Sequence, residues 1–265
     1  MSLLINQLDN DILYPDSDGT PMAESDPARD YLIYGVESLS IYFQDRQDVY
    51  VSGNLFIYYK KGVPDAVVAP DVFVVFGVEK KKRQSYKVWE EGNKFPAFVL
   101  EVTSKTTQEK DEEDKPKKYQ RLGVLEYFQF DPTGDYLQPQ LKGSRLIDGR
   151  YRAIAQTRLP GGGLSLRSEA LDLELRLMSG ELRFFNPQTG QNLLSFAETE
   201  QALQATEQAL QATEQALQAT EQALQQEVQA RRDAVSRLLG LGLSVEQVSE
   251  ALSLSVEEVR RPPNS

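Results

Sequence analysis

The chain has 265 residues, of which 40 are acidic and 29 basic, so its net charge at pH 7 is −11. It contains no histidine and no cysteine, which excludes Ser–His–Asp and Cys–His nucleophiles, thiol redox chemistry, disulfides and zinc sites built from these residues. Chemistry at neutral pH is left to carboxylates, Lys, Tyr, Ser, Thr and hard metal ions bound by oxygen. An acidic chain has no general attraction for nucleic acid, so such a contact needs a local basic patch or a metal ion.

The predicted location is the cytoplasm, without membrane contact. The first residues show neither the basic segment nor the long apolar run of a signal peptide. The longest apolar runs, at 72–78 and 95–102, fall far short of the roughly 20 residues that a membrane span needs. The absence of disulfides agrees with a reducing compartment.

The predicted centre of the fold is a set of three strands. The apolar runs at 71–78, 97–103 and 126–130 are continuous rather than alternating, which is typical of strands buried on both faces. Between the second and third strands, residues 107–122 predict a surface helix closed by Gly123, in which Pro116 either kinks the helix or marks its start. This order predicts a mixed sheet over one core.

Further elements surround these strands. Residues 23–46 are amphipathic and predict a helix, and residues 54–59 predict a short strand. From 136 to 186, short apolar segments alternate with Gly and Pro, as in β-hairpins. The predicted fold class is therefore α+β.

The composition changes near Phe196, where a nearly perfect seven-residue repeat begins. Its Ala, Glu, Gln and Leu favour one long helix, with Leu203, Leu210, Leu217 and Leu224 on a thin apolar stripe. Either this helix forms a coiled coil and makes the protein a homo-oligomer, or it is a solvated helix without a partner. We expect three parts, at 1–196, 197–239 and 240–265.

The last part predicts two short helices, with Ser244 and Ser255 as N-caps. Their spacing is similar to that of a helix-turn-helix unit, whose second helix would need basic residues to read DNA. Only Arg260 and Arg261 are available, beside two glutamates. A small helical hairpin that caps the long helix is the favoured interpretation.

Two phrases carry candidate chemistry. In VVAPDVFVVFG, Asp71 opens a buried strand, and in FVLEVTSK, Glu101 interrupts one. A carboxylate in a buried strand is costly unless it is paired or binds a cation. Two such acids with a lysine in reach are typical of a Mg²⁺ site that activates water and holds a phosphate. The simpler alternatives are that Asp71 caps its strand and that Glu101 forms a buried salt bridge with a lysine.

These phrases resemble the Uma-two family of endonucleases, abundant in cyanobacteria, within the PD-(D/E)XK nuclease superfamily. Pro70–Asp71 matches the PD element and Glu101 the acidic element. The family's Asp, Lys and Tyr at four-residue intervals match Asp111, Lys115 and Tyr119, and its GVxEYxxxDP pattern matches 123–132. The resemblance, from about residue 20 to 190, implies a restriction-endonuclease-like mixed sheet flanked by helices. It also implies hydrolysis of DNA phosphodiester bonds with Mg²⁺ or Mn²⁺.

The resemblance implies Asp71 and Glu101 as metal ligands, with a catalytic lysine nearby. The strict motif would place that lysine at position 103, where this chain has Thr103. Lys105 and Lys115 are the two candidates, and Lys115 is favoured. Other assignments are weaker: a phosphate contact for Gln129, a third metal ligand such as Glu37, and either a phosphate contact or a solvated loop for KKKR at 80–83.

Two functions follow. The first is a metal-dependent endonuclease whose partner is nucleic acid, with Asp71, Glu101, Lys115 and Lys105 as candidate catalytic residues. The second is a catalytically silent module that keeps a nuclease fold for binding or oligomerisation. The net charge and the displaced lysine favour the second; the paired acidic motifs favour the first.

Overall fold

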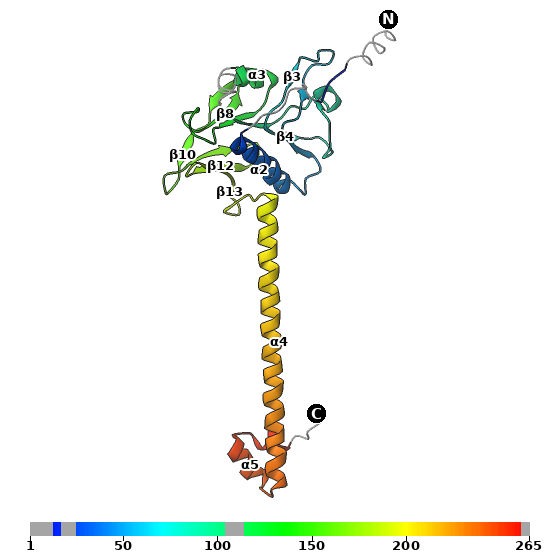
Figure 1. Ribbon diagram of the computed structural model, residues 1–265, viewed down its shortest axis with the longest axis vertical. Coiled ribbons are helices and arrows are strands. Elements are labelled where there is room, and N and C mark those ends of the chain that lie inside the picture. Colours follow the sequence, from blue (N-terminus) through cyan, green and yellow to red (C-terminus); the bar gives the residue numbers. More distant parts are fainter. Residues whose placement is uncertain (1–12, 17–24, 104–113, 261–265) are drawn as a thin grey trace. The chain divides into compact units, whose positions relative to one another are not determined.

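The computed structural model describes residues 13–16, 25–103 and 114–260 (Figure 1). The chain divides into two compact units, Met1–Thr199 and Glu200–Ser265. The first unit contains all the strands that the structure describes, and the second is helical. Within the described ranges, no helix combines the length and the apolarity needed to cross a membrane.

The main sheet of the first unit has six strands in the order β1-β4-β6-β7-β8-β9. β6 and β7 are parallel, and the other neighbours are antiparallel. A parallel pair needs a crossover connection, and α3 (Lys115–Leu122) lies in it. The strands are β1 (Val49–Ser52), β4 (Val72–Phe76), β6 (Phe98–Val102), β7 (Glu126–Phe130), β8 (Leu141–Ile147) and β9 (Arg150–Ala153).

The central strands of this sheet are buried on both faces, which explains their unbroken apolar runs. Successive residues of β4 alternate between two cores: Val72 and Val74 belong to one, Phe73 and Val75 to the other. The first core lies under α2 (Asp26–Tyr42), whose N-cap is Ser25. The second lies under α3. The predicted mixed sheet and the α+β class are thus confirmed.

A second sheet packs on the α2 side of the main sheet, because its inward leucines and Phe184 join the first core. Its strands follow one another in chain order from β10 to β14, and each is antiparallel to the next. Figure 1 shows this sheet beside α2. Glu126 ties the two sheets together: its carboxylate accepts hydrogen bonds from Arg145, Ser168 and the Glu169 N–H. The strands are β10 (Gln156–Arg158), β11 (Leu164–Ser168), β12 (Leu173–Met178), β13 (Glu181–Asn186) and β14 (Gln191–Asn192).

A small third sheet contributes to the second core. It consists of β2 (Ile57–Tyr58), β3 (Val67–Val68) and β5 (Tyr86–Lys87), and the short 3₁₀ helix η1 (Val88–Glu90) follows β5. The strand predicted at 54–59 is therefore reduced to β2. The predicted helix at 23–46 ends at Tyr42, and β1 follows it without having been predicted.

The C-terminal helices start with α4 (Phe196–Gly240), a single helix of 45 residues. α5 (Val245–Leu252) begins with a capping box between Ser244 and Gln247. α6 (Val256–Arg260) begins after Ser255, whose hydroxyl accepts a hydrogen bond from the Glu258 N–H. Both predicted N-caps are confirmed, and Val248 and Val259 are the buried residues of the two short helices.

Candidate active site

Asp71 and Glu101 lie side by side on neighbouring strands. Val72 of β4 pairs with Leu100 of β6 in antiparallel register. One residue further along this register, Asp71 lies opposite Glu101. Asp71 Oδ2 accepts a hydrogen bond of 2.7 Å from the Val102 N–H, and the charge of the neighbouring Glu101 is close enough to raise the pKa of Asp71. The sheet register therefore brings together the two acids that the sequence motifs singled out.

Two side chains of α3 hold Glu101 from above the sheet. The Lys115 ammonium donates to Glu101 Oε2 at 2.9 Å, and the Tyr119 hydroxyl donates to Oε1 at 2.6 Å. Lys115 and Tyr119 are four residues apart, so they share one face of the helix. Glu101 itself is 0 % exposed, whereas the Lys115 side chain is 30 % exposed. The site thus reaches solvent on the lysine side.

The electrostatics of the pair differ from those of isolated acids. Burial raises the pKa of Asp71 well above 3.8, and the neighbouring charge of Glu101 raises it further. The Lys115 charge and the Val102 N–H lower that pKa only in part. Burial and Glu101 also raise the pKa of Tyr119, which keeps its phenol protonated and able to donate to Glu101.

A row of polar residues continues across the same face of the sheet. Glu101 pairs with Gln129 of β7, and Gln129 pairs with Lys142 of β8. Thr103 follows on the same face, because side chains two residues apart in an extended strand point the same way. Its hydroxyl is buried and has no hydrogen-bond partner among the described residues. Glu101, Gln129 and Lys142 therefore form a row across β6, β7 and β8.

The donor atoms of the pair fit a hard divalent cation. Carboxylate oxygens are the ligands that Mg²⁺ and Mn²⁺ prefer, and each oxygen has two lone pairs, so the bonds from Lys115 and Tyr119 leave acceptor capacity on Glu101. In the part of the chain described here, no group of three or more acids is arranged to hold a metal ion. Among the described residues, Asp71 and Glu101 are therefore the two carboxylates that the structure offers a cation at this site.

The backbone around Asp71 is held by the segment after β1. The Asn54 N–H donates to the Pro70 carbonyl at 3.0 Å. A Cβ added to Gly53 would lie only 2.2 Å from the Asp71 carbonyl oxygen, so only glycine allows the two backbones to approach this closely. The Pro–Asp motif is thus fixed from both sides, by β6 and by this segment.

The other predicted residues lie elsewhere or outside the described ranges. Lys105 and Asp111 fall in 104–113, which the structure does not describe. Glu37 is on α2, across the sheet from Glu101, and its carboxylate accepts a hydrogen bond from the Phe196 N–H. The structure thus does not bring Glu37 to the acid pair.

The basic run at 80–83 follows the opposite end of β4 from Asp71. Arg83 forms an ion pair with Glu91 at 2.7 Å and lies 4.2 Å from the centre of the Tyr50 ring. The Lys80 ammonium donates to the carbonyls of Phe43 and Gln44, just after α2. Lys80 and Arg83 therefore stabilise the fold, while Lys80, Lys81 and Lys82 are exposed as in a solvated loop. The phosphate contact stays a prediction.

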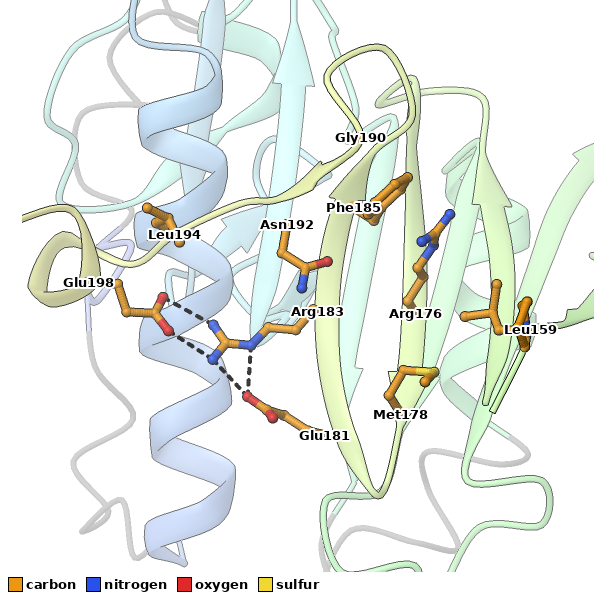
Figure 2. A pocket seen from close by; sticks show the side chains of 11 residues that line it. Leu159, Arg176, Met178, Glu181, Arg183, Phe185, Gly190, Asn192, Leu194 and Glu198 are labelled. Carbon is orange, nitrogen blue, oxygen red and sulfur yellow. Dashed lines mark hydrogen bonds and ion pairs between the residues drawn. The ribbon is translucent and has the colours of Figure 1, made fainter. Parts of the chain in front are cut away.

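A groove on the second sheet lies away from the acid pair. It has a volume of about 630 Å³ and is lined by residues of β12, β13 and the segment before α4. Figure 2 shows Arg183 between Glu181 and Glu198, its partners in ion pairs. Arg176 lies over the Phe185 ring. Because its cations are already paired, the groove offers no uncompensated charge to a ligand.

Tyr119 is the main residue of the site to which the sequence assigned no role. Its spacing from Lys115 placed it on the same helix face, but its contact with Glu101 depends on how α3 lies over β6. Lys142 was missed because only the register of β7 and β8 connects it to Gln129.

Comparison with known families connects this geometry to a nuclease fold. The model of the Uma2 family, described as "Putative restriction endonuclease", matches residues 31–178. No curated protein matches the chain. The matched range contains the Pro–Asp motif, the acid pair, α3 and the strands that carry the polar row. Because the match covers more than half of the 265 residues, the chain belongs to the Uma2 family.

Proposed function

We propose that this protein is a metal-dependent endonuclease that hydrolyses phosphodiester bonds of DNA. The observation that carries the proposal is the pairing of Asp71 and Glu101 on adjacent strands, with the Lys115 ammonium 2.9 Å from Glu101. Membership of the Uma2 family, described as "Putative restriction endonuclease", supports nuclease activity and nucleic acid as the substrate class.

In this proposal the acid pair holds the cation. Asp71 and Glu101 would bind Mg²⁺ or Mn²⁺, which supplies Lewis-acid activation of the attacking water and of the scissile phosphate. The Tyr119 hydroxyl fixes the orientation of the Glu101 carboxylate. Val102 does the same for Asp71 through its backbone N–H. Both carboxylates are therefore positioned before a substrate arrives.

Lys115 is the proposed catalytic lysine. Its ammonium group is partly exposed and already lies beside the acid pair, so it can offset the negative charge that develops on the phosphate or orient the attacking water. Lys105 stays the second candidate for this role. Gln129, next to Glu101 in the sheet register, is a candidate hydrogen-bond donor to a phosphate oxygen.

The catalytically silent module is the second candidate, and one contact favours it. The ion pair between Lys115 and Glu101 neutralises the buried carboxylate without a cation, as a structural salt bridge would. In that case the fold would serve binding or oligomerisation, and cations would leave the protein unaffected.

Plasmid nicking separates the two candidates. With Mg²⁺ or Mn²⁺, the wild-type protein is expected to convert supercoiled DNA to nicked and linear forms. Asp71→Asn and Glu101→Gln should each lower the rate by about 100-fold or more, because each removes a metal ligand. A matched control is Asp148→Asn, which changes an exposed acid on the turn between β8 and β9. Full activity in the Asp71→Asn/Glu101→Gln double variant would refute the assigned roles.

A further inference from the structure

The long helix α4 carries a regular row of exposed leucines. Leu203, Leu210, Leu217 and Leu224 are each 58 to 60 % exposed, and no residue of α4 is buried. They recur every seven residues, which matches the 3.5-residue period of a left-handed coiled coil. An apolar row of this length on a single helix is typical of a seam that pairs with another helix.

The threonines of the repeat can share this seam with the leucines. Thr206, Thr213 and Thr220 each follow a leucine by three residues, as core positions of a heptad do. Each threonine hydroxyl donates to the carbonyl of the alanine four residues earlier, at 2.8 to 2.9 Å. Because the hydroxyl is satisfied within its own helix, the threonine methyl group can be buried against a partner without leaving an unpaired donor.

The charges of the repeat favour one direction for a pair of identical helices. Glutamates follow the core threonines directly, and alanines precede the core leucines directly. In a parallel pair, these two flanking positions face each other across the seam, so glutamate meets alanine. In an antiparallel pair, glutamate would meet glutamate, and like charges disfavour that arrangement. The flanking residues are Glu207, Glu214 and Glu221, with Ala202, Ala209 and Ala216.

We propose that α4 forms a parallel, in-register coiled coil with α4 of a second copy of this chain. An identical helix in register places leucine against leucine and threonine against threonine in alternating layers. Both copies of the first unit then attach at the same end of the coil. This pairing does not depend on the proposed nuclease chemistry, so either can fail without the other.

The oligomeric state of the full chain tests the pairing. Sedimentation equilibrium is expected to give twice the chain mass of 29.9 kDa. Leu210→Asp/Leu217→Asp should give the monomer mass with an unchanged helical circular dichroism signal, since both leucines are exposed in the single chain. The matched control, Gln208→Asp/Gln215→Asp, adds the same charges away from the seam and should stay dimeric. A monomeric wild type at about 100 µM, or a dimer that tolerates the leucine changes, would overturn the proposal.

The direction of the pair needs a separate measurement, which the absence of native cysteine makes simple. In a parallel pair, Thr206→Cys places the two new thiols in one layer, and mild oxidation should link almost all of the dimer. In an antiparallel pair, the two thiols would lie at separate layers. Because an antiparallel pair sets threonine layers against leucine layers, failure of Thr206→Cys to cross-link, together with linkage in a mixture of Thr206→Cys and Leu217→Cys chains, would contradict the parallel direction.

Discussion

At the residue scale, Asp71 and Glu101 differ in how the fold satisfies their carboxyl groups. Glu101 receives hydrogen bonds from Lys115 and Tyr119, whereas Asp71 receives one from the Val102 N–H. Burial, and after it the neighbouring charge of Glu101, raise the pKa of Asp71. The Asp71 carboxylate therefore lowers folding stability at neutral pH, because the Lys115 charge offsets this burial only in part.

This cost leads to a prediction for Asp71→Asn in the presence of EDTA. The raised pKa means that the folded chain binds more protons than the unfolded chain, so the Asp71 carboxyl lowers stability as pH rises above 3.8. Asparagine keeps the hydrogen bond from Val102 but carries no charge. The free energy of unfolding at pH 7 should rise by about 1 kcal/mol.

Urea unfolding at two pH values measures this effect. The gain should be present at pH 7 and should shrink toward pH 4, where the wild-type Asp71 is protonated in the folded chain. Asp148→Asn again serves as the control and should change little, since Asp148 is exposed. A loss of stability in Asp71→Asn at pH 7 would mean that the carboxylate stabilises the fold, as in an ordinary salt bridge.

At the element scale, the strands of the site could be predicted, but their register could not. β4, β6 and β7 were predicted because strands buried on both faces need unbroken apolar runs, and these runs stand out in the sequence. β1 has only four residues, which is too short for a hydrophobic pattern to identify it as a strand. The row from Glu101 through Gln129 to Lys142 depends on strand pairing, which distant parts of the chain decide together. The acids, Lys115 and Gln129 could thus be named from the sequence, but the contact of Tyr119 and the position of Lys142 could not.

Asp131, an acid of the family pattern, stabilises the turn that follows β7. Asp131 is buried, and its carboxylate accepts hydrogen bonds from the N–H groups of Thr133, Tyr136 and Leu137 and from the Thr133 hydroxyl. Burial by itself would raise the pKa of Asp131, but these hydrogen bonds outweigh it and lower the pKa below 3.8. The family's Asp–Pro pattern therefore closes a turn here instead of adding an acid to the site.

Asp131→Asn should for this reason destabilise the fold in a pH-dependent way. A carboxylate with a lowered pKa stabilises the folded chain above its unfolded pKa, and that contribution is lost as pH falls through the folded pKa. Asparagine replaces a charged acceptor with a neutral one, so the free energy of unfolding at pH 7 should drop by about 2 kcal/mol. The difference from wild type should narrow below about pH 3.8. Chemical unfolding at pH 7 and pH 3 tests this, and equal differences at both values would rule the argument out.

At the scale of the whole molecule, a net charge of −11 disfavours the binding of negatively charged nucleic acid. The basic run at 80–83 does not compensate for this at the acid pair, because it follows the far end of β4 and part of it is bound within the fold. Among the described residues on the face that carries the acid pair, Lys115 contacts Glu101 and Lys142 pairs with Gln129 in the sheet register. A divalent cation held by Asp71 and Glu101 would add positive charge where the substrate phosphate must lie. The proposed chemistry and the proposed docking of DNA thus depend on the same ion.

Isothermal titration of the full-length protein with Mn²⁺ therefore decides between an endonuclease and a silent module. We expect one site per chain with a Kd of roughly 0.1 to 1 mM, and no binding to the Asp71→Asn/Glu101→Gln double variant. The Asp148→Asn control should bind as the wild type does. If the wild type takes up no Mn²⁺ in this range, or if the double variant binds it equally well, the acid pair is not a metal site and the endonuclease proposal is wrong.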